Sequence, residues 1–223
     1  SRAQSVSPFV SSTAAASDIQ GWVLEPLFTR DPDMASRWYG VLASSIQEMV
    51  APEESDAETP YRVRVELRRG ITFSDGEPMT ADDVIFTHRF VMDERIWAGR
   101  YRFSWSGITA VQRVDDHTVD FVFAEPGFRS INSIRGFQVI PKHVYSAYLE
   151  SDDTAWRYNE STDILVGTGP YVLTAGPTAE GVTLTRNKNY WGLRPPLDAI
   201  EYRVMESGAD QRSAFANDDT DIY

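Results

Sequence analysis

Residues 61–93 constrain the fold more than any other stretch of the chain. In 61–67, apolar residues alternate with Arg and Glu, which predicts a strand with one buried face and one charged face. Asp75-Gly76 then predicts a tight turn. Thr80 opens the sequence T-A-D-D, in which Thr80 is positioned to cap a helix and Asp83 to lie near its positive end. A strand followed by a turn and a helix indicates a mixed α and β chain.

The rest of the chain supports this mixed class, with mostly antiparallel strand pairs. Residues 108–114 and 118–123 predict a hairpin closed by a turn at 115–117. The sequence GTGPY at 167–171 predicts a sharp turn that enters a strand, with 182–185 as its antiparallel partner. Further predicted elements are a helix capped by Asp18, a short helix at 42–49, a helix at 141–149, a polar connector at 150–163, a strand at 199–205 and a final helix capped by Ser207.

The composition excludes several classes of protein. Hydrophobic residues make up 42% of the 223 residues and charged residues 24%, so the chain is not disordered as a whole. The absence of cysteine excludes disulfides, thiolate catalysis and Cys-based metal sites. No apolar run approaches the length of a transmembrane helix. The net charge of −12 argues against nucleic acid or an anionic membrane as partner. All but two of the 21 basic residues are Arg, which fits either a saline habitat or a GC-rich genome.

The sequence contains no recognisable catalytic, metal or cofactor motif. The three histidines, His88, His117 and His143, lack the spacing of metal ligands. There is no G-x-S-x-G elbow. The G-T-G at 167–169 lacks the Lys of a phosphate-binding loop, and Pro170 removes a backbone donor, so a structural turn is the favoured interpretation. We therefore expect no catalytic residue, no metal and no cofactor. A carboxylate pair brought together by folding, and thus a hydrolase, stays a remote alternative.

Two segments are candidates for contact with a ligand. Residues 97–105 contain Trp97, Tyr101 and Trp105, which either pack in the core or line a cleft as an aromatic platform. The run Ser11-Ser12-Thr13-Ala14 is either a plain tail or a place where the backbone closely approaches an extended ligand.

Several segments, in order, resemble the family 5 extracellular solute-binding proteins of ABC importers, the oligopeptide- and dipeptide-binding type. The strongest are VELRRGITFSDGEPMTADDVIFTHRFVMD at 65–93, VGTGPYVLTA at 166–175 and TLTRNKNYWG at 183–192. VDDHTVDFVFAEP at 114–126 and VIPKHVY at 139–145 support them. The chain departs from the family pattern at 44–60, where Ile46 stands in place of a common Trp, and 97–105 does not align.

The resemblance implies an α/β (mixed α+β) fold of the periplasmic-binding-protein-like class II, in which two lobes enclose the solute. Residues 1–30 and 160–223 would form an incomplete first lobe, and 31–159 a small inserted α+β domain. The second lobe would be absent, so the chain is expected to be an N-terminal fragment whose signal segment lies upstream. We expect a periplasmic or extracellular location, and a monomer at full length.

The resemblance also implies capture of a peptide-like solute and its delivery to the membrane permease of an ABC importer, without enzymatic activity. Carried over by position, Ser11, Ser12, Thr13 and Ala14 are the predicted ligand contacts. Trp97, Tyr101 and Trp105 are further candidates, and Thr168 is one near the hinge. The alternatives are another solute, such as an oligosaccharide, an opine or a metal chelate, or a sensory or scaffold use of the same fold.

Overall fold

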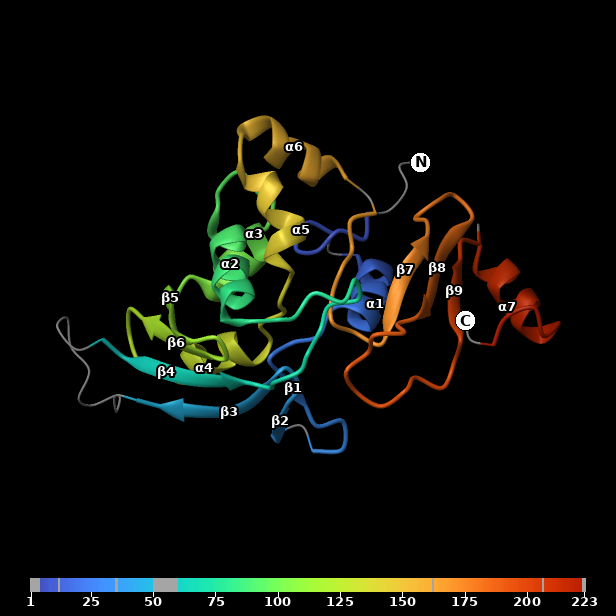
Figure 1. Cartoon of the computed structure of the whole chain (residues 1–223). Coiled ribbons are helices and arrows are strands. Elements are labelled where there is room, and N and C mark those ends of the chain that lie inside the picture. The colour runs from blue at the N-terminus through green and yellow to red at the C-terminus, as the bar shows by residue number, and fades with distance from the viewer. Residues whose placement is uncertain are drawn as a thin grey trace.

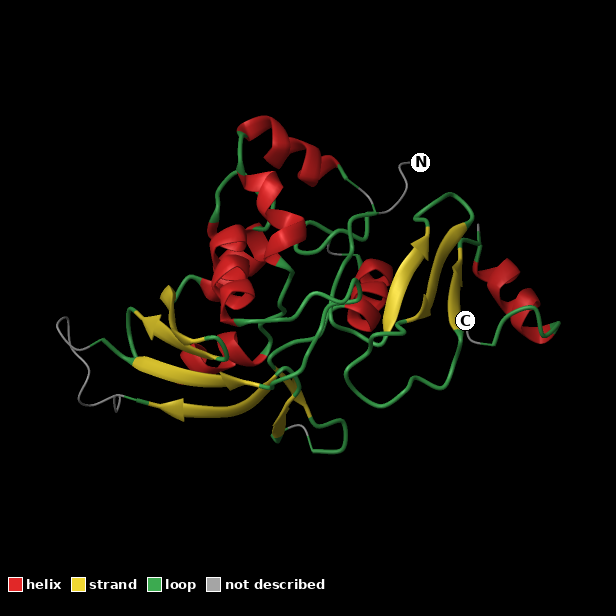
Figure 2. Cartoon of the chain, in the orientation of Figure 1, coloured by secondary structure: helices red, strands yellow, loops and turns green. Residues whose placement is uncertain are grey.

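The part of the chain that the structure describes contains three antiparallel sheets and seven α-helices. The computed structural model describes residues 5–11, 13–34, 36–49, 60–161, 163–205 and 207–221. A four-stranded sheet lies at one end of the molecule and a three-stranded sheet at the other, with helix α1 (Ala14–Val23) beside the smaller sheet (Figure 1). Figure 2 shows that most of the remaining helices gather over the larger sheet. No helix in the described ranges has both the length and the apolar character needed to cross a bilayer.

The larger sheet has the strand order β3-β4-β6-β5, and every neighbouring pair is antiparallel. The predicted alternation is confirmed in its central strand, where Val63 and Val65 are buried while Arg64 faces outward. Arg64 donates two hydrogen bonds to the buried carboxylate of Asp120 on the next strand, at 2.7 and 2.8 Å. The strands are β3 (Ala43–Glu48), β4 (Arg62–Leu67), β5 (Ile108–Asp115) and β6 (Thr118–Phe123).

Helix α2 (Ala81–Met92) packs on the apolar face of this sheet. It begins as predicted, because Thr80 and Asp83 form a reciprocal capping box. Its buried face includes Phe86 and Phe90, and the Phe90 ring meets Tyr145 and Tyr158 of later helices. Those helices are α3 (Gly99–Trp105), α4 (Phe128–Arg135), α5 (Lys142–Tyr145) with a 3-10 turn (Ser146–Leu149), and α6 (Asp152–Glu160).

The smaller sheet has the order β7-β8-β9 and is antiparallel throughout, as the sequence predicts. Helix α1 packs against β7, where the Trp22 ring meets the Tyr171 ring edge-on at 5.5 Å. A two-stranded hairpin follows α1, and a final helix follows β9 with Ser207 as its cap. These elements are β1 (Phe28–Arg30), β2 (Trp38–Gly40), β7 (Tyr171–Ala175), β8 (Gly181–Arg186), β9 (Ala199–Arg203) and α7 (Gly208–Ala216).

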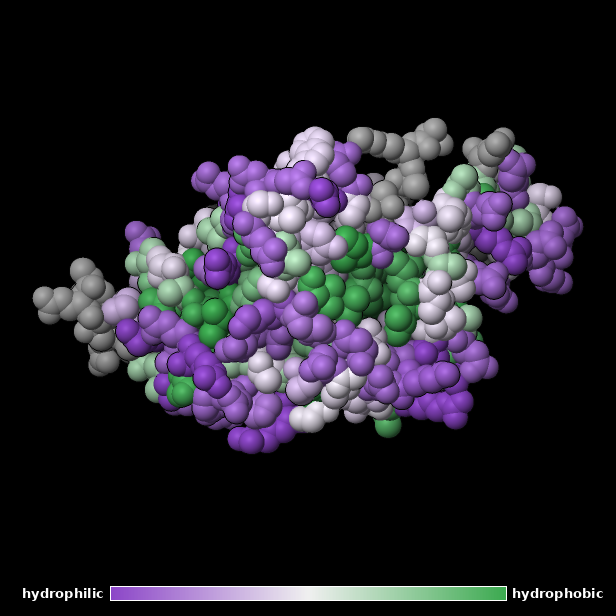
Figure 3. Space-filling model, turned by 45° about the horizontal axis from the view of Figure 1, so that its top comes forward, coloured by the Kyte–Doolittle hydropathy of each residue, from purple (hydrophilic) through white to green (hydrophobic). Residues whose placement is uncertain are grey.

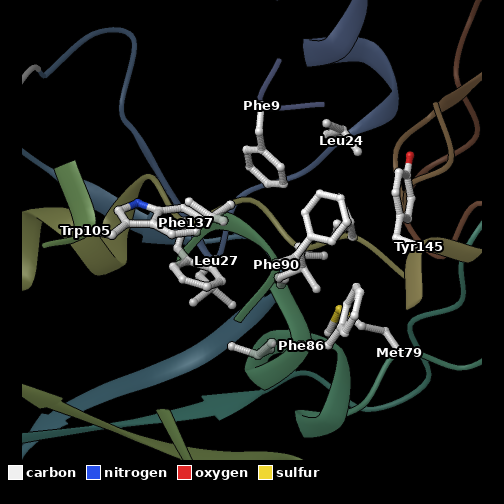
Figure 4. Packing of buried hydrophobic residues seen from close by; sticks show 14 of the residues in the cluster. Phe9, Leu24, Leu27, Met79, Phe86, Phe90, Trp105, Phe137 and Tyr145 are labelled. Atoms are coloured by element: carbon white, nitrogen blue, oxygen red, sulfur yellow. The ribbon is translucent and has the colours of Figure 1, made fainter. Parts of the chain in front are cut away.

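One hydrophobic cluster joins the four-stranded and the three-stranded sheet. It contains Val65 from β4 and Leu184 from β8, so both sheets contribute to it. In the close view, Phe9 and Leu24 from the N-terminal region approach Phe90 of α2 (Figure 4). The N-terminal segment is therefore part of the core, because its apolar side chains fill the space between the helices and the sheets.

Three sequence predictions about local structure are wrong. Residues 42–49 form strand β3 rather than a helix, because pairing with β4 decides the conformation of a short apolar segment. Helix α1 begins at Ala14 and is capped by Thr13, so Asp18 lies within it. The polar residues 150–163 contain helix α6, whose two acidic residues in the first turn stabilise its positive end.

Candidate functional site

The predicted ligand-binding run lies at the beginning of α1. The Thr13 hydroxyl accepts a hydrogen bond from the Ala16 amide at 3.2 Å, so Thr13 is the N-cap, and Ala14 is the first helical residue. Both side chains are exposed, while Ser11 is half-buried. Ser12 lies outside the described residues. Small exposed side chains at a helix start leave the backbone accessible to a ligand.

The segment before α1 is anchored at several points. The Gln20 amide donates to the carbonyls of Val6 and Ser7 at 3.1 and 3.0 Å, and the Tyr158 hydroxyl donates to the Pro8 carbonyl at 2.6 Å. Phe9 then adopts a φ of 66°, in the left-handed region that L-residues rarely occupy. These bonds fix the approach of the chain to Ser11.

The aromatic residues of 97–105 are brought close to this segment. The Phe9 ring meets the Tyr101 ring edge-on at 5.0 Å and the Trp105 ring at 5.8 Å. Trp105 is 2% exposed and stacks on Phe137 at 4.1 Å, so its ring is part of the core. Trp97 is 51% exposed, and Tyr101 lies between the two in burial. The core interpretation therefore holds for Trp105, and the surface interpretation holds for Trp97.

Trp97 forms an exposed aromatic pair with Trp156 of α6. Their ring centroids are 5.4 Å apart and the rings are nearly perpendicular. The Trp97 amide donates to the Asn159 side chain at 2.9 Å, and the Asn159 amide group donates to the Arg95 carbonyl at 2.7 Å. The pair is thus held in place by a buried asparagine, since Asn159 itself is buried.

Thr168 lies at the other end of α1. Its side chain is fully buried, and its hydroxyl donates to Glu25 at 2.9 Å. The Gly169 amide donates to the Val23 carbonyl at 2.9 Å, which fixes the GTGPY turn against the C-terminal end of the helix. A ten-residue helix is about 15 Å long, so Thr168 is remote from the predicted run at 11–14. The structure does not bring the two together.

Sequence reasoning missed Glu25, the central residue of a buried polar network. The Glu25 carboxylate is 7% exposed and accepts hydrogen bonds from Thr168, from the Tyr190 hydroxyl at 2.9 Å and from the Trp191 indole at 2.8 Å. Burial raises the pKa of Glu25, and the three hydrogen bonds oppose part of that rise. The only signal in the sequence is a single charge within the otherwise apolar run VLEPL.

The described residues contain no group of three His, Asp or Glu side chains placed to hold a metal ion. Each of the three histidines has different neighbours. His88 bonds to the Ile108 carbonyl, and burial lowers its pKa. His143 bonds to Asp75 at 2.7 Å, and His117 lies in the turn between β5 and β6.

A family model of bacterial extracellular solute-binding proteins, family 5 (middle region), matches residues 30–223. The chain belongs to this family. The predicted resemblance is therefore confirmed, and so is the mixed α/β, periplasmic-binding-protein-like fold. The match covers the four-stranded and the three-stranded sheet. It does not test the predicted division into 1–30 with 160–223 and 31–159, which stays a prediction.

Individual relatives agree with the family. The oligopeptide-binding protein AppA of Bacillus subtilis is 26% identical over 166 residues, which are 74% of this chain and 28% of AppA. The structure of B. subtilis AppA with a nonapeptide aligns at a TM-score of 0.78 and 21% identity, over 96% of this chain and 40% of AppA. AgaA from A. tumefacien R10, in complex with agropinic acid, aligns at 0.79 and 18% identity, over 97% and 40%. A Thermotoga maritima protein bound to mannohexaose aligns at 0.76 and 24% identity, over 98% and 38%.

The chain is shorter than these proteins. It spans 28% of AppA in the sequence comparison and about 40% of the three solved chains.

Proposed function

We propose that this chain forms one wall of a solute-binding cleft and that the bound solute is peptide-like. The observation that supports the proposal is the ring contact between Tyr101 of the aromatic helix α3 and Phe9, which lies two residues before the run at 11–14. Backbone groups at the start of α1 would pair with the backbone of an extended peptide. Trp97 and the exposed edge of Tyr101 would contact its side chains. The bound nonapeptide of AppA supports a peptide as the solute.

One face of the molecule has an exposed apolar area. Figure 3 shows a hydrophobic area across the middle of one face, between hydrophilic side chains on either side. Exposed apolar areas with polar rims are typical of contact sites. The solute would be released unchanged to the membrane permease of an ABC importer, in the periplasm or outside the cell. Binding by the whole protein would couple to closure of a second lobe over the solute.

An oligosaccharide is the second candidate solute, and the Trp97–Trp156 pair favours it. Both rings are about half exposed, at 51% and 54%, and exposed aromatic rings provide apolar faces for the C–H groups of sugars. The mannohexaose bound to the Thermotoga maritima protein supports this alternative. The two solutes are distinguished by which residues respond to each.

The test is a titration of the ¹⁵N-labelled chain with a trialanine peptide and, separately, with mannohexaose. We expect trialanine to bind on the order of millimolar, because a single wall supplies few contacts, and to shift the amides of Ser11, Thr13 and Ala14. Trp97→Ala should weaken binding. Trp22→Ala is the matched control, since Trp22 has a similar exposure at the opposite end of α1.

A response to mannohexaose alone, centred on the Trp97 indole, would favour the sugar. Shifts confined to the Trp22 end of α1, or loss of binding in Trp22→Ala but not in Trp97→Ala, would contradict the proposed site for both solutes.

A further inference from the structure

An open pocket of about 660 Å³ lies at one end of the larger sheet, away from the run at 11–14. Three strand ends meet there: β4 ends at Leu67, β5 ends at Asp115 and β6 begins at Thr118. The loop that follows β8 supplies Trp191 as a further wall. The volume is in the range of pockets that hold small organic ligands.

The pocket is lined by opposite charges that do not pair with each other. Arg69 and Glu66 both face it, and neither side chain makes a hydrogen bond or an ion pair with another residue in the described ranges. Arg68 is different, because its guanidinium donates to the carbonyls of Val41 and Gly40 at 2.8 and 3.2 Å. The pocket thus has one cation and one anion that lack hydrogen-bond partners in the described ranges, while the charge of Glu66 acts on Arg64 and that of Arg69 acts on Asp115.

Asp115 does not fill the role of partner to Arg69. Its carboxylate accepts the His117 amide at 2.7 Å, and this bond is the main cause of its lowered pKa. The Thr118 hydroxyl adds a second hydrogen bond, and the charge of Arg69 contributes less. Asp115 is therefore satisfied within its own turn, and the Arg69 guanidinium keeps its donors for another group.

His117 also lines this wall. Its Nδ1 has no hydrogen-bond partner among the residues that the structure describes, but the atom is buried, so it is not accessible from the pocket. The apolar walls, Leu67 and Trp191, complete the lining beside these polar groups.

We propose that this pocket is a binding site for a small zwitterion with an apolar side chain, such as a free amino acid. The carboxylate of the ligand would meet Arg69, and its ammonium group would meet Glu66. The apolar side chain would lie against Leu67 and Trp191. A ligand of one charge would leave either Arg69 or Glu66 without a partner, which is why the balanced lining favours both charges together. The site is independent of the proposed cleft.

The test compares three ligands that share one side chain. The ¹⁵N-labelled chain is titrated with L-leucine, with 4-methylpentanoate, which lacks the ammonium group, and with 3-methylbutylamine, which lacks the carboxylate. We expect leucine to shift the amides of Arg69, His117 and Thr118 and the indole of Trp191. Each analogue should bind about twofold to fivefold more weakly, as expected for the loss of one exposed charge pair.

Two variants then assign the charges. Arg69→Gln should weaken 4-methylpentanoate but not 3-methylbutylamine, and Glu66→Gln should do the reverse. Arg194→Gln is the control, because Arg194 is exposed in the neighbouring loop and does not line the pocket. The proposal is overturned if leucine shifts none of these signals, if either analogue binds as well as leucine, or if the shifts centre on Thr13 and Trp97 instead.

Discussion

Glu25 offers the sharpest test of how this structure is held together. Its carboxylate accepts three hydrogen bonds: from Thr168 in the GTGPY turn, and from Tyr190 and Trp191 after β8. Two substitutions separate the charge from the hydrogen bonds. Glu25→Ala removes every acceptor. Glu25→Gln removes only the charge, because its carbonyl oxygen can accept from Thr168 and Trp191 while its amide donates to the Tyr190 hydroxyl.

The magnitude follows from how well each donor is buried. Thr168 is fully buried, so in Glu25→Ala its hydroxyl loses its only acceptor without access to water, at a cost of about 1–3 kcal/mol. Tyr190 and Trp191 are half-buried and lose about 0.5–1 kcal/mol each. We expect Glu25→Ala to lower the free energy of unfolding by about 2–5 kcal/mol. For a chain of this size, that lowers Tm by about 4–20 °C.

The pH dependence separates Glu25→Gln from the native protein. Burial, the largest cause, raises the pKa of Glu25 in the folded state above its usual 4.5. A raised pKa means that the contribution of Glu25 to stability is fully present below pH 4.5 and is lost as the pH rises through the folded-state pKa. Gln has no proton to lose. The stability of Glu25→Gln relative to the native chain should therefore increase as the pH rises above 4.5.

The assay is urea unfolding of the native chain and both variants, followed by tryptophan fluorescence, at several pH values from 4.5 to 8. The other carboxylates contribute equally to the native chain and Glu25→Gln, so the difference between these two isolates Glu25. A difference that is constant with pH, or that falls as pH rises, would refute the assignment of a raised pKa. A loss below about 1 kcal/mol in Glu25→Ala would refute the role of the network.

Two further predictions concern close contacts of the fold. Gly167→Ala should lower the free energy of unfolding in urea by about 1–3 kcal/mol, because a Cβ there overlaps a backbone carbonyl at the end of α1. Gly107→Ala is the control: a Cβ at Gly107 contacts no other atom, so the free energy of unfolding should change little. Equal effects of the two alanines would contradict this packing. Arg64→Ala should cost about 1–3 kcal/mol, because it leaves the buried Asp120 carboxylate without its two guanidinium donors. The control is Arg89→Ala, at an exposed position of α2, which should lower the free energy of unfolding by less than about 0.5 kcal/mol. If Arg64→Ala costs no more than this control, the Arg64–Asp120 pair does not stabilise the fold.

Local sequence signals predicted the elements that depend on residues close together in the chain. The alternation at 61–67 specified β4, because its period matches a strand with one buried face. The capping residues Thr80 and Asp83 specified the start of α2, because they satisfy its first amides within four residues. The failed helix at 42–49 has no such local signal. Its conformation comes from pairing with β4, a strand that begins more than ten residues later.

The candidate site divides in the same way. The small residues at 11–14 and the aromatic residues at 97–105 were predicted as ligand contacts from their residue types. The ring contacts of Phe9, which precedes the run, with Tyr101 and Trp105 join segments that are remote in sequence. Thr168 was predicted near a hinge, yet its hydroxyl is committed to Glu25. Whether a side chain lines a surface or fills the core depends on neighbours that are remote in sequence, as Trp97 and Trp105 illustrate.

The sequence by itself determined the family, the mixed α/β class and most element boundaries, because capping, alternation and turn formation act over a few residues. The tertiary structure alone decided that Gly167 and Gly169 are needed where the turn meets the end of α1, and that the single acid in VLEPL is the acceptor of three distant donors. It also decided that Arg69, Glu66 and His117 line one pocket. These features depend on desolvation and on contacts between segments that only folding brings together.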